Sequence, residues 1–383
     1  MKVVIAIDSL KGSLSSMDAG NAIKQGILRV CDAQVIVKPL ADGGEGTVDA
    51  LLSGMEGRKV ERIVTGPLGE KISASYGILF ENNTGILEMA AAAGINLVPK
   101  DLLNPLNTTT YGVGEMISDA IQRGCRNFII GIGGSATNDC GIGMLQALGF
   151  KFTDKDGNSV GIFGKDILEI TGINEEGVLP ELKECRFKIA CDVTNPLFGE
   201  QGATHIFGPQ KGATPDMVTM LDNGFIKFSE LIKHTVSKDY ASIPGAGAAG
   251  GLGYAFLTFL NATLESGIQI ILNQIKLEND IHDADFVITG EGRLDFQTSM
   301  GKAPVGVARL AKKHGKKVIA FAGGTTMDAE KCNDVIDAYF SILQLPMPLN
   351  EAMNPQTTTE NLSSTASQVF RLISTLDSSK NEK

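Results

Sequence analysis

The chain has 383 residues, 43% of them apolar and 20% charged, which is the composition of a globular protein with room for two domains and excludes disorder for most of its length. The formal net charge of −10 excludes broad binding to nucleic acid or to anionic membranes, because such binding requires a basic face. No apolar run reaches the roughly 18 residues that span a bilayer. The chain also enters a strand-like pattern without a signal-peptide cleavage region, so we expect a cytoplasmic protein with no membrane partner.

The N-terminal part of the chain begins with a strand, a loop and a helix. The first β-branched run predicts the strand, and Ser15 with Asp18 has the spacing of a capping box at the start of the helix. The loop between them carries Asp8, Lys11 and Ser13, which could face a ligand. The alternative is that these residues only cap the helix and hold a solvated lysine.

A second strand-like run is followed by the sequence ADGGEGT at positions 41–47. Two glycines, Gly43 and Gly44, directly after Asp42 predict a tight turn at a helix start, where free amides can hold phosphate or a substrate carboxylate. Asp42 is then a candidate metal ligand or base, although it could simply cap the helix.

The pattern changes between residues 72 and 89. Alternating apolar and small polar residues, followed by the turn sequence NNTG, predict an antiparallel β-hairpin. We therefore predict an α/β protein of two domains. The first is formed by residues 1–65 and 283–383, and the second is an α/β domain inserted at 66–282.

The sequence GGSATND follows another predicted strand, at positions 133–139. Gly133, Gly134 and Ser135 have the composition of an anion-binding nest, and Asn138 with Asp139 adds oxygen ligands at a helix start. The alternative is a glycine turn followed by an Asn or Asp cap.

Two further segments bear on the chemistry. Asp192 follows the predicted strand 187–190, which places a carboxylate at another strand end. The sequence GAGAAGG at 245–251 contains GxGxxG, but the segment before it, which includes Pro244, is not a strand, so close helix packing or a backbone approach to substrate is the better interpretation than a dinucleotide site.

The stretch 288–304 combines the groups that an anionic ligand and a metal require. Glu291 and Asp295 could hold a metal ion, and Arg293 and Lys302 add positive charge. The glycines that leave room for backbone amides to approach an anion are Gly290, Gly292 and Gly301.

These strand-end loops indicate phosphoryl transfer, which needs amides and cations against phosphates, carboxylates for magnesium and one carboxylate as proton acceptor. The chain has no GxxxxGK[ST] loop, no protein-kinase motif set and no GxSxG elbow. The six cysteines lack a CxxC pair, so we expect reduced thiols. The residues alone therefore predict an anion-binding α/β enzyme of the phosphotransferase type.

A resemblance adds the substrate. Seven segments between Asp8 and Gly324 resemble the successive motifs of the type 1 glycerate kinase family, with Leu10 standing where an aromatic residue is expected. They are DSLKGSLSS, ADGGEGT, GIGGSATNDCGIGMLQALG, CDVTNPLFGEQGA, FGPQKGA, PGAGAAGGLG and TGEGRLDFQTSMGKAPVGVA. The resemblance implies ATP-dependent phosphorylation of D-glycerate, favouring 2-phosphoglycerate as product. It also implies that the first domain is a flavodoxin-like, doubly wound parallel-sheet domain, with the active site in a cleft between it and the inserted α/β domain.

The resemblance also suggests roles. Asp192 or Asp295 would accept the hydroxyl proton, with Asp42 as the next candidate, while Lys11 and Arg293 would neutralise the phosphates or the glycerate carboxylate. The expected metal ligands for Mg²⁺ are Asp42, Asp139 and Glu291. The expected substrate or nucleotide contacts are Ser13, Gly43, Gly44, Gly133, Gly134, Ser135, Asn138, Gly290, Gly292 and Lys302.

Three alternatives stay open: a nicotinamide-dependent hydroxyacid dehydrogenase, a kinase for another small hydroxy acid, and a non-catalytic binding protein. The sequence leaves the 2- or 3-hydroxyl as acceptor, the identity of the base, and a monomer or homodimer undecided.

Overall fold

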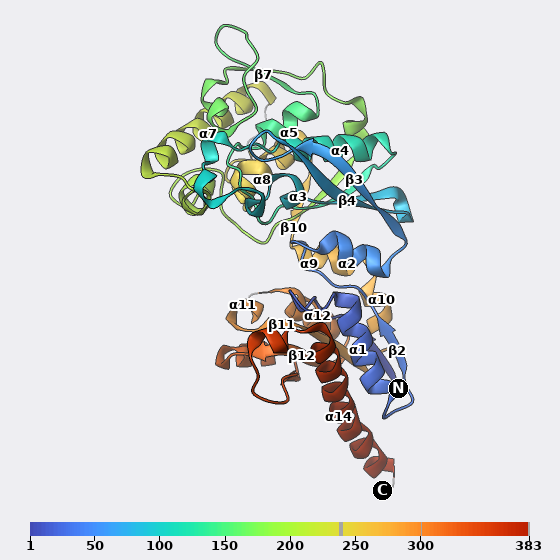
Figure 1. The fold of residues 1–383 in the computed structure, drawn as a ribbon. Helices are drawn as coiled ribbons and strands as arrows, with labels where there is room; N and C mark the ends of the chain where they lie inside the picture. Colours follow the sequence, from blue (N-terminus) through green and yellow to red (C-terminus); the bar gives the residue numbers. More distant parts are fainter. Residues whose placement is uncertain (237–239, 300, 382–383) are drawn as a thin grey trace. The chain divides into compact units, whose positions relative to one another are not determined.

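The computed structural model describes residues 1–236, 240–299 and 301–381, and the chain forms two compact units (Figure 1). Unit 1 combines Met1–Asp42, Asp49–Met55 and Ile271–Lys383, and unit 2 combines Gly43–Val48 and Glu56–Ile270. The chain thus enters and leaves the inserted unit earlier than the expected boundaries after residues 65 and 282. The physical reason is that the strand at 57–65 hydrogen-bonds into the sheet of unit 2.

The sheet of unit 1 has five parallel strands in the order β13-β12-β11-β1-β2. They are β1 (Lys2–Ile5), β2 (Gln34–Val37), β11 (Phe286–Leu294), β12 (Lys317–Thr325) and β13 (Ala338–Ser341). Numbered along the chain within the unit, this is the 2-1-3-4-5 order of flavodoxin-like sheets, so the predicted fold class is confirmed. Successive residues of β1, Val3, Val4 and Ile5, are all fully buried, as expected for a parallel strand covered on both faces.

The helices of unit 1 are α1 (Ser16–Leu28), α10 (Leu277–Ile281), α11 (Phe296–Ser299), α12 (Ala303–Lys313), α13 (Leu349–Ala352), α14 (Pro355–Asn381) and the 3₁₀ helix η8 (Met327–Asp334). Helix α1 begins as predicted, because Ser15 Oγ accepts a hydrogen bond of 3.1 Å from the amide of Asp18. Helix α14 lies beside α1 (Figure 1). Gly26 permits this approach, since a Cβ there would meet the carbonyl oxygen of Ser363 at 2.2 Å.

Unit 2 contains a mixed six-stranded sheet in the order β10-β9-β6-β5-β4-β3. Its strands are β3 (Gly57–Thr65), β4 (Lys71–Leu79), β5 (Thr84–Glu88), β6 (Asn127–Gly131), β9 (Arg186–Ala190) and β10 (Thr263–Glu265). The predicted hairpin is confirmed, because β4 pairs antiparallel with β5 across a turn in which Asn82 and Asn83 have φ values of 55° and 47°. The strands from β5 to β10 are parallel, and a separate ribbon joins β7 (Lys151–Thr153) to β8 (Gly172–Asn174).

The helices of unit 2 surround one apolar core in which the rings of Phe128 and Phe187 stack at 4.8 Å. They are α3 (Ala90–Ala93), α4 (Tyr111–Gln122), α5 (Ile142–Ala147), α6 (Ala203–Phe207), α7 (Pro215–Val236) and α8 (Ala248–Phe259). The 3₁₀ helices are η1 (Glu81–Asn83), η2 (Ile95–Leu97), η3 (Lys100–Leu102), η4 (Pro105–Asn107), η5 (Gly164–Glu169), η6 (Pro180–Glu184) and η7 (Pro209–Lys211). Helices α2 (Thr47–Gly54) and α9 (Gly267–Gln274) each include a boundary between the units.

The segment 245–251 is part of this core. Gly250 and Gly251 have φ values of 68° and 87°, and a Cβ on Gly250 would lie 2.2 Å from the carbonyl oxygen of Thr137. These glycines serve close backbone packing, as the sequence interpretation favoured, rather than a dinucleotide turn.

All six cysteines are free thiols. Within the described ranges, no helix has the length and apolar character required to cross a membrane.

Candidate active site

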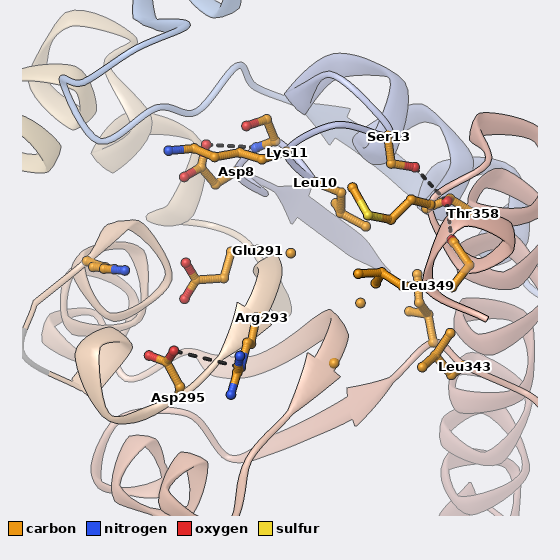
Figure 2. Close-up of a pocket in the computed structure, with 18 of the residues that line it drawn as sticks. Asp8, Leu10, Lys11, Ser13, Glu291, Arg293, Asp295, Leu343, Leu349 and Thr358 are labelled. Carbon is orange, nitrogen blue, oxygen red and sulfur yellow. Dashed lines mark hydrogen bonds and ion pairs between the residues drawn. The ribbon is translucent and has the colours of Figure 1, made fainter. Parts of the chain in front are cut away.

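A pocket of about 540 Å³ opens in unit 1 at the carboxyl ends of β1, β11 and β12. Figure 2 shows charged side chains toward one end of it and leucines toward the other. The lining residues are Asp8, Ser9, Leu10, Lys11, Ser13, Asp42, Glu291, Gly292, Arg293, Asp295, Lys302, Gly323, Gly324, Ile342, Leu343, Leu349, Ala352, Met353 and Thr358. We call this the unit 1 pocket. The strands β1 and β11 flank the point where the strand order reverses, which is the ligand position in flavodoxin-like sheets.

The structure corrects the expected form of the stretch 288–304. Strand β11 continues to Leu294, so Glu291 and Arg293 project from an extended strand rather than from the loop after it. Gly290 does not line the pocket. A Cβ on Gly290, whose φ is 153°, would lie 1.8 Å from the carbonyl oxygen of Phe321 in β12, so this glycine serves strand packing. Gly292 does line the pocket.

Four carboxylates line the pocket: Asp8, Asp42, Glu291 and Asp295. Burial first, and then the charges of Asp42 and Glu291, raise the pKa of Asp8 from 3.8 to about 7, although the amide of Ser9, which donates to Asp8 Oδ1 at 2.7 Å, acts in the opposite direction. Burial likewise raises the pKa of Glu291, although the hydroxyl of Thr298 donates to its Oε1 at 2.5 Å. Like charges held this close favour the binding of a cation.

From the sequence Asp8 could face a ligand, but we gave it no catalytic or metal-binding role. It follows directly after β1, and that position was the signal that could have suggested such a role.

The cations of the pocket are exposed. Lys11 and Lys302 lie on the surface, and Lys302 Nζ donates to Gln297 Oε1 at 3.0 Å. The Arg293 side chain is 69% exposed and its Nε lies 3.9 Å from Asp295 Oδ2. Asp295 itself accepts a hydrogen bond of 2.8 Å from the amide of Gln297 at the start of α11, so this carboxylate has a structural task.

The turn after Asp42 is already occupied by a protein anion. The amides of Gly46 and Val48 donate to the two carboxylate oxygens of Glu88 at 3.1 and 2.8 Å. Gly43 is buried with a φ of 86°, and a Cβ on it would lie 2.8 Å from the Cα of Gly267. We expected the amides at this helix start to hold phosphate, but in the structure they bind the side chain of Glu88. Gly43 and Gly44 belong to unit 2.

The segment 133–139 of unit 2 is largely buried. Gly133 and Gly134 are exposed, but Ser135 is 9% exposed and Asn138 and Asp139 are fully buried. Asp139 Oδ2 accepts hydrogen bonds from the amide and hydroxyl of Thr110 at 2.8 and 2.7 Å, and burial raises its pKa.

Lys211 is buried beneath this segment. From the sequence alone it could equally have been a solvated lysine. Lys211 is 1% exposed, and its Nζ donates to Ser135 Oγ at 2.8 Å and to the carbonyl oxygen of Thr137 at 2.6 Å. Burial lowers the pKa of Lys211 to about 7. The lysine thus supports the turn 133–135 from inside the protein.

Asp192 is exposed after β9, and its Oδ1 accepts a hydrogen bond of 3.2 Å from the amide of Gly267. Of the residues expected to contact substrate, nucleotide or metal, the unit 1 pocket contains Lys11, Ser13, Asp42, Glu291, Gly292, Arg293, Asp295 and Lys302. The others belong to unit 2, except Gly290, which packs against β12.

A flavodoxin-like sheet with carboxylates and cations gathered at its switch point defines an α/β enzyme that handles anionic ligands, of the phosphotransferase type. The comparison with known proteins makes this specific: residues 3–374 match the model of the glycerate kinase family, and the chain belongs to that family.

Individual relatives agree over nearly the whole chain. The protein is 49% identical to glycerate 2-kinase of Escherichia coli (strain K12), over 92% of this chain and 93% of that protein. It is 46% identical to glycerate kinase of Bacillus subtilis (strain 168), with the same coverage of 92% and 93%. A crystal structure assigned to glycerate kinase 2 of Salmonella typhimurium LT2 superimposes with a TM-score of 0.91 at 43% identity, covering 100% of this chain and 99% of that one.

Proposed function

We propose that the protein transfers the γ-phosphoryl group of ATP to D-glycerate, giving 2-phosphoglycerate and ADP. The observation that carries the proposal is the unit 1 pocket, which combines exposed cations with clustered carboxylates at the switch point of a flavodoxin-like sheet. Family membership supports glycerate as the acceptor. The E. coli relative named glycerate 2-kinase supports the 2-hydroxyl.

In this proposal the cations bind the negative charges of the substrates. Lys11, Arg293 and Lys302 line one pocket and are exposed to it. Charge-assisted hydrogen bonds from these groups would hold the phosphates or the glycerate carboxylate and stabilise charge that develops during transfer. The exposed turn of Gly133 and Gly134 is a second candidate anion contact in unit 2.

The donor set of the pocket fits magnesium. Carboxylate oxygens of Asp42 and Glu291 would hold the ion, which when bound neutralises phosphate charge. Over the described residues, no three His, Cys, Asp or Glu side chains form a group that could hold a metal ion. Proteins commonly bind Mg²⁺ through one or two carboxylates, with phosphate and water as the remaining ligands. Asp139 is not part of this proposal, because its carboxylate is buried and hydrogen-bonded to Thr110.

Phosphoryl transfer also needs a group that accepts the proton of the glycerate hydroxyl. The hydroxyl oxygen forms a bond to the γ-phosphorus, the bond to the β–γ bridging oxygen breaks, ADP leaves and the proton passes to a carboxylate. We retain Asp192 as the first candidate, since it is exposed. Asp295 is second because its carboxylate caps α11, and Asp42 is third because it is also a candidate metal ligand.

A coupled ADP-release assay with D-glycerate, ATP and Mg²⁺, followed by phosphorus NMR of the product, tests the proposal. ADP release with a 2-phosphoglycerate resonance supports it, and a 3-phosphoglycerate resonance would correct the acceptor position. Folded protein that releases no ADP above a control without glycerate would refute ATP-dependent glycerate phosphorylation.

We expect the enzyme to act in the cytoplasm as a monomer or homodimer.

A further inference from the structure

The end of the unit 1 pocket away from the charged groups is apolar. It is lined by Leu10, Ile342, Leu343, Leu349, Ala352 and Met353, and Figure 2 shows Leu10, Leu343 and Leu349 on this side, apart from Glu291 and Asp295. We call these six residues the apolar wall. Leu343 is 42% exposed and Leu349 is 74% exposed, so large apolar side chains face open space beside a charged site.

Glycerate does not account for the apolar wall. Every carbon of glycerate carries an oxygen, so it offers almost no apolar surface to bury. The other substrate of the proposed reaction is a nucleoside triphosphate, whose aromatic base is flat and largely apolar on its faces. A pocket with a charged end and an apolar end fits a ligand with a polyphosphate at one end and a base at the other, and about 540 Å³ is within the usual range for small-molecule sites.

The hydroxyl groups next to the apolar wall are occupied by protein partners. Ser13 Oγ lies 2.6 Å from Thr358 Oγ1, and Thr358 Oγ1 also lies 3.0 Å from the carbonyl oxygens of Ala352 and Asn354. Neither hydroxyl can therefore donate to a base edge without breaking one of these hydrogen bonds.

Four backbone amides of the apolar wall are engaged as well. The amide of Ile342 donates to Ala322 at 2.9 Å, and the amide of Leu343 donates to Ser341 Oγ at 3.3 Å. In α13 and directly after it, the amides of Ala352 and Met353 donate to carbonyl oxygens of the same turn at 3.0 and 2.9 Å. These donors are therefore not available to the ring nitrogen or oxygen by which adenine and guanine differ.

We infer that the apolar wall holds the nucleobase of the phosphoryl donor by apolar contact, and that the enzyme discriminates little between ATP and GTP. This inference rests on the proposed function. A site that recognises a base by hydrogen bonds rejects the wrong partner by about 10⁴-fold or more, whereas an apolar pocket separates ligands of similar shape by roughly 10- to 200-fold at most. Because the donors named above are already engaged, this site belongs with the apolar pockets, which separate ligands of similar shape only weakly.

The first experiment compares ATP with GTP as donors at saturating D-glycerate and Mg²⁺. We expect kcat/KM values within about tenfold of each other. A preference for ATP above about 10³-fold, with normal ATP turnover, overturns the inference and leaves the proposed function standing. If neither nucleotide is turned over, calorimetric titration of the intact protein with ADP and with GDP replaces the assay. Similar affinities then support the inference, and the absence of binding overturns it.

The second experiment tests whether the nucleobase contacts the apolar wall. Leu349→Ser removes an exposed side chain, and we expect the KM for ATP and for GTP to rise by the same factor of about ten while the KM for glycerate stays unchanged. Leu372→Ser is the matched control, since this leucine is 61% exposed on α14 and does not line the pocket. An unchanged KM for both nucleotides in Leu349→Ser, or a rise in the KM for glycerate instead, would refute the assignment.

Discussion

The unit 1 pocket and the segment 133–139 of unit 2 are similar in sequence, since both place glycines and acidic residues after a strand, yet their charged groups differ in environment. In the pocket, Lys11 and Arg293 are exposed and the carboxylate of Asp8 has a raised pKa beside other carboxylates. In the segment, Asp139 and the supporting Lys211 are buried and hydrogen-bonded within the protein. The comparison teaches that such motifs predict polar strand ends, but not whether the polar groups face a ligand or the protein.

The largest effect on activity is expected from the substitution of Asp192, the exposed carboxylate at a strand end of unit 2. Asp192→Asn keeps the size of the side chain and the acceptor for the Gly267 amide, but removes the basic carboxylate. We expect kcat to fall about 10²- to 10⁴-fold with an unchanged melting temperature. Steady-state ADP release checks this, with Asp156→Asn in an exposed turn as control. A folded Asp192→Asn enzyme with full turnover would exclude the residue as base and pass the role to Asp295 or Asp42.

The next effect concerns the buried cation. Lys211→Met removes the donor to Ser135 Oγ and to the Thr137 carbonyl, and we expect it to lower the free energy of unfolding by about 1–3 kcal/mol because buried acceptors lose their partner. Urea denaturation measures this change, with the exposed Lys155→Met as control.

The pH dependence of the same variant gives a second test. The pKa of Lys211 is lowered to about 7 in the folded protein, against about 10.4 for an unfolded lysine, so the native state binds fewer protons across that interval. The contribution of this group to stability therefore rises with pH between about 7 and 10. Lys211→Met should lack that rise, and equal pH slopes for the variant and the parent protein would contradict the buried, neutral lysine.

A smaller effect on activity, with none on stability, is expected in the unit 1 pocket. Arg293 is 69% exposed and only loosely paired with Asp295, so Arg293→Met should leave the free energy of unfolding within about 0.5 kcal/mol. Loss of one charge-assisted contact to an anionic substrate should lower kcat/KM about 10- to 100-fold. Arg371→Met, on the exposed surface of α14, serves as the control. Unchanged kcat/KM would remove Arg293 from the site.

The smallest expected effect is a pH-dependent stability change at Asp8. Its pKa is raised from 3.8 to about 7 in the folded protein, so the native state binds more protons than the unfolded state between these values. The stability contributed by this group is therefore lost as pH rises from about 4 to 7. Asp8→Asn should melt a few degrees higher than the parent protein at pH 8, with a smaller difference at pH 5.

Magnesium sharpens the test of Asp8. A cation bound near the carboxylates should raise the melting temperature of the parent protein more at pH 8 than at pH 5, since it offsets the repulsion among Asp8, Asp42 and Glu291. Thermal unfolding at both pH values, with and without Mg²⁺, provides the measurement. A parent protein that is as stable as Asp8→Asn at pH 8 without metal would contradict an unfavourable charge on the buried Asp8.

The sequence predicted the features that depend on local pattern. The β-branched run of β1, the capping residue Ser15 and the hairpin of β4 and β5 are each determined by neighbouring residues, and all are present. The flavodoxin-like fold class of unit 1 followed from the resemblance and is also confirmed.

The sequence did not predict features that depend on distant partners. Strand β11 continues through Glu291 because β12 pairs alongside it, and no local pattern marks that extension. The helix-start amides after Asp42 bind Glu88, and Lys211 lies under Ser135, a residue 76 positions earlier in the chain. These long-range contacts determine which polar groups face a ligand, so the local sequence could not predict it.

The division of unit 1 into separate chain segments has a consequence for biosynthesis. Val3 of β1 pairs with Phe286 of β11, so β1 and its central neighbour lie 283 positions apart along the chain. At about 5–20 residues per second, β11 is synthesised tens of seconds after β1, while the long segment Glu56–Ile270 of unit 2 is already complete. During translation β1 therefore has only β2 to pair with, and its edge toward β11 stays unpaired until β11 has been made.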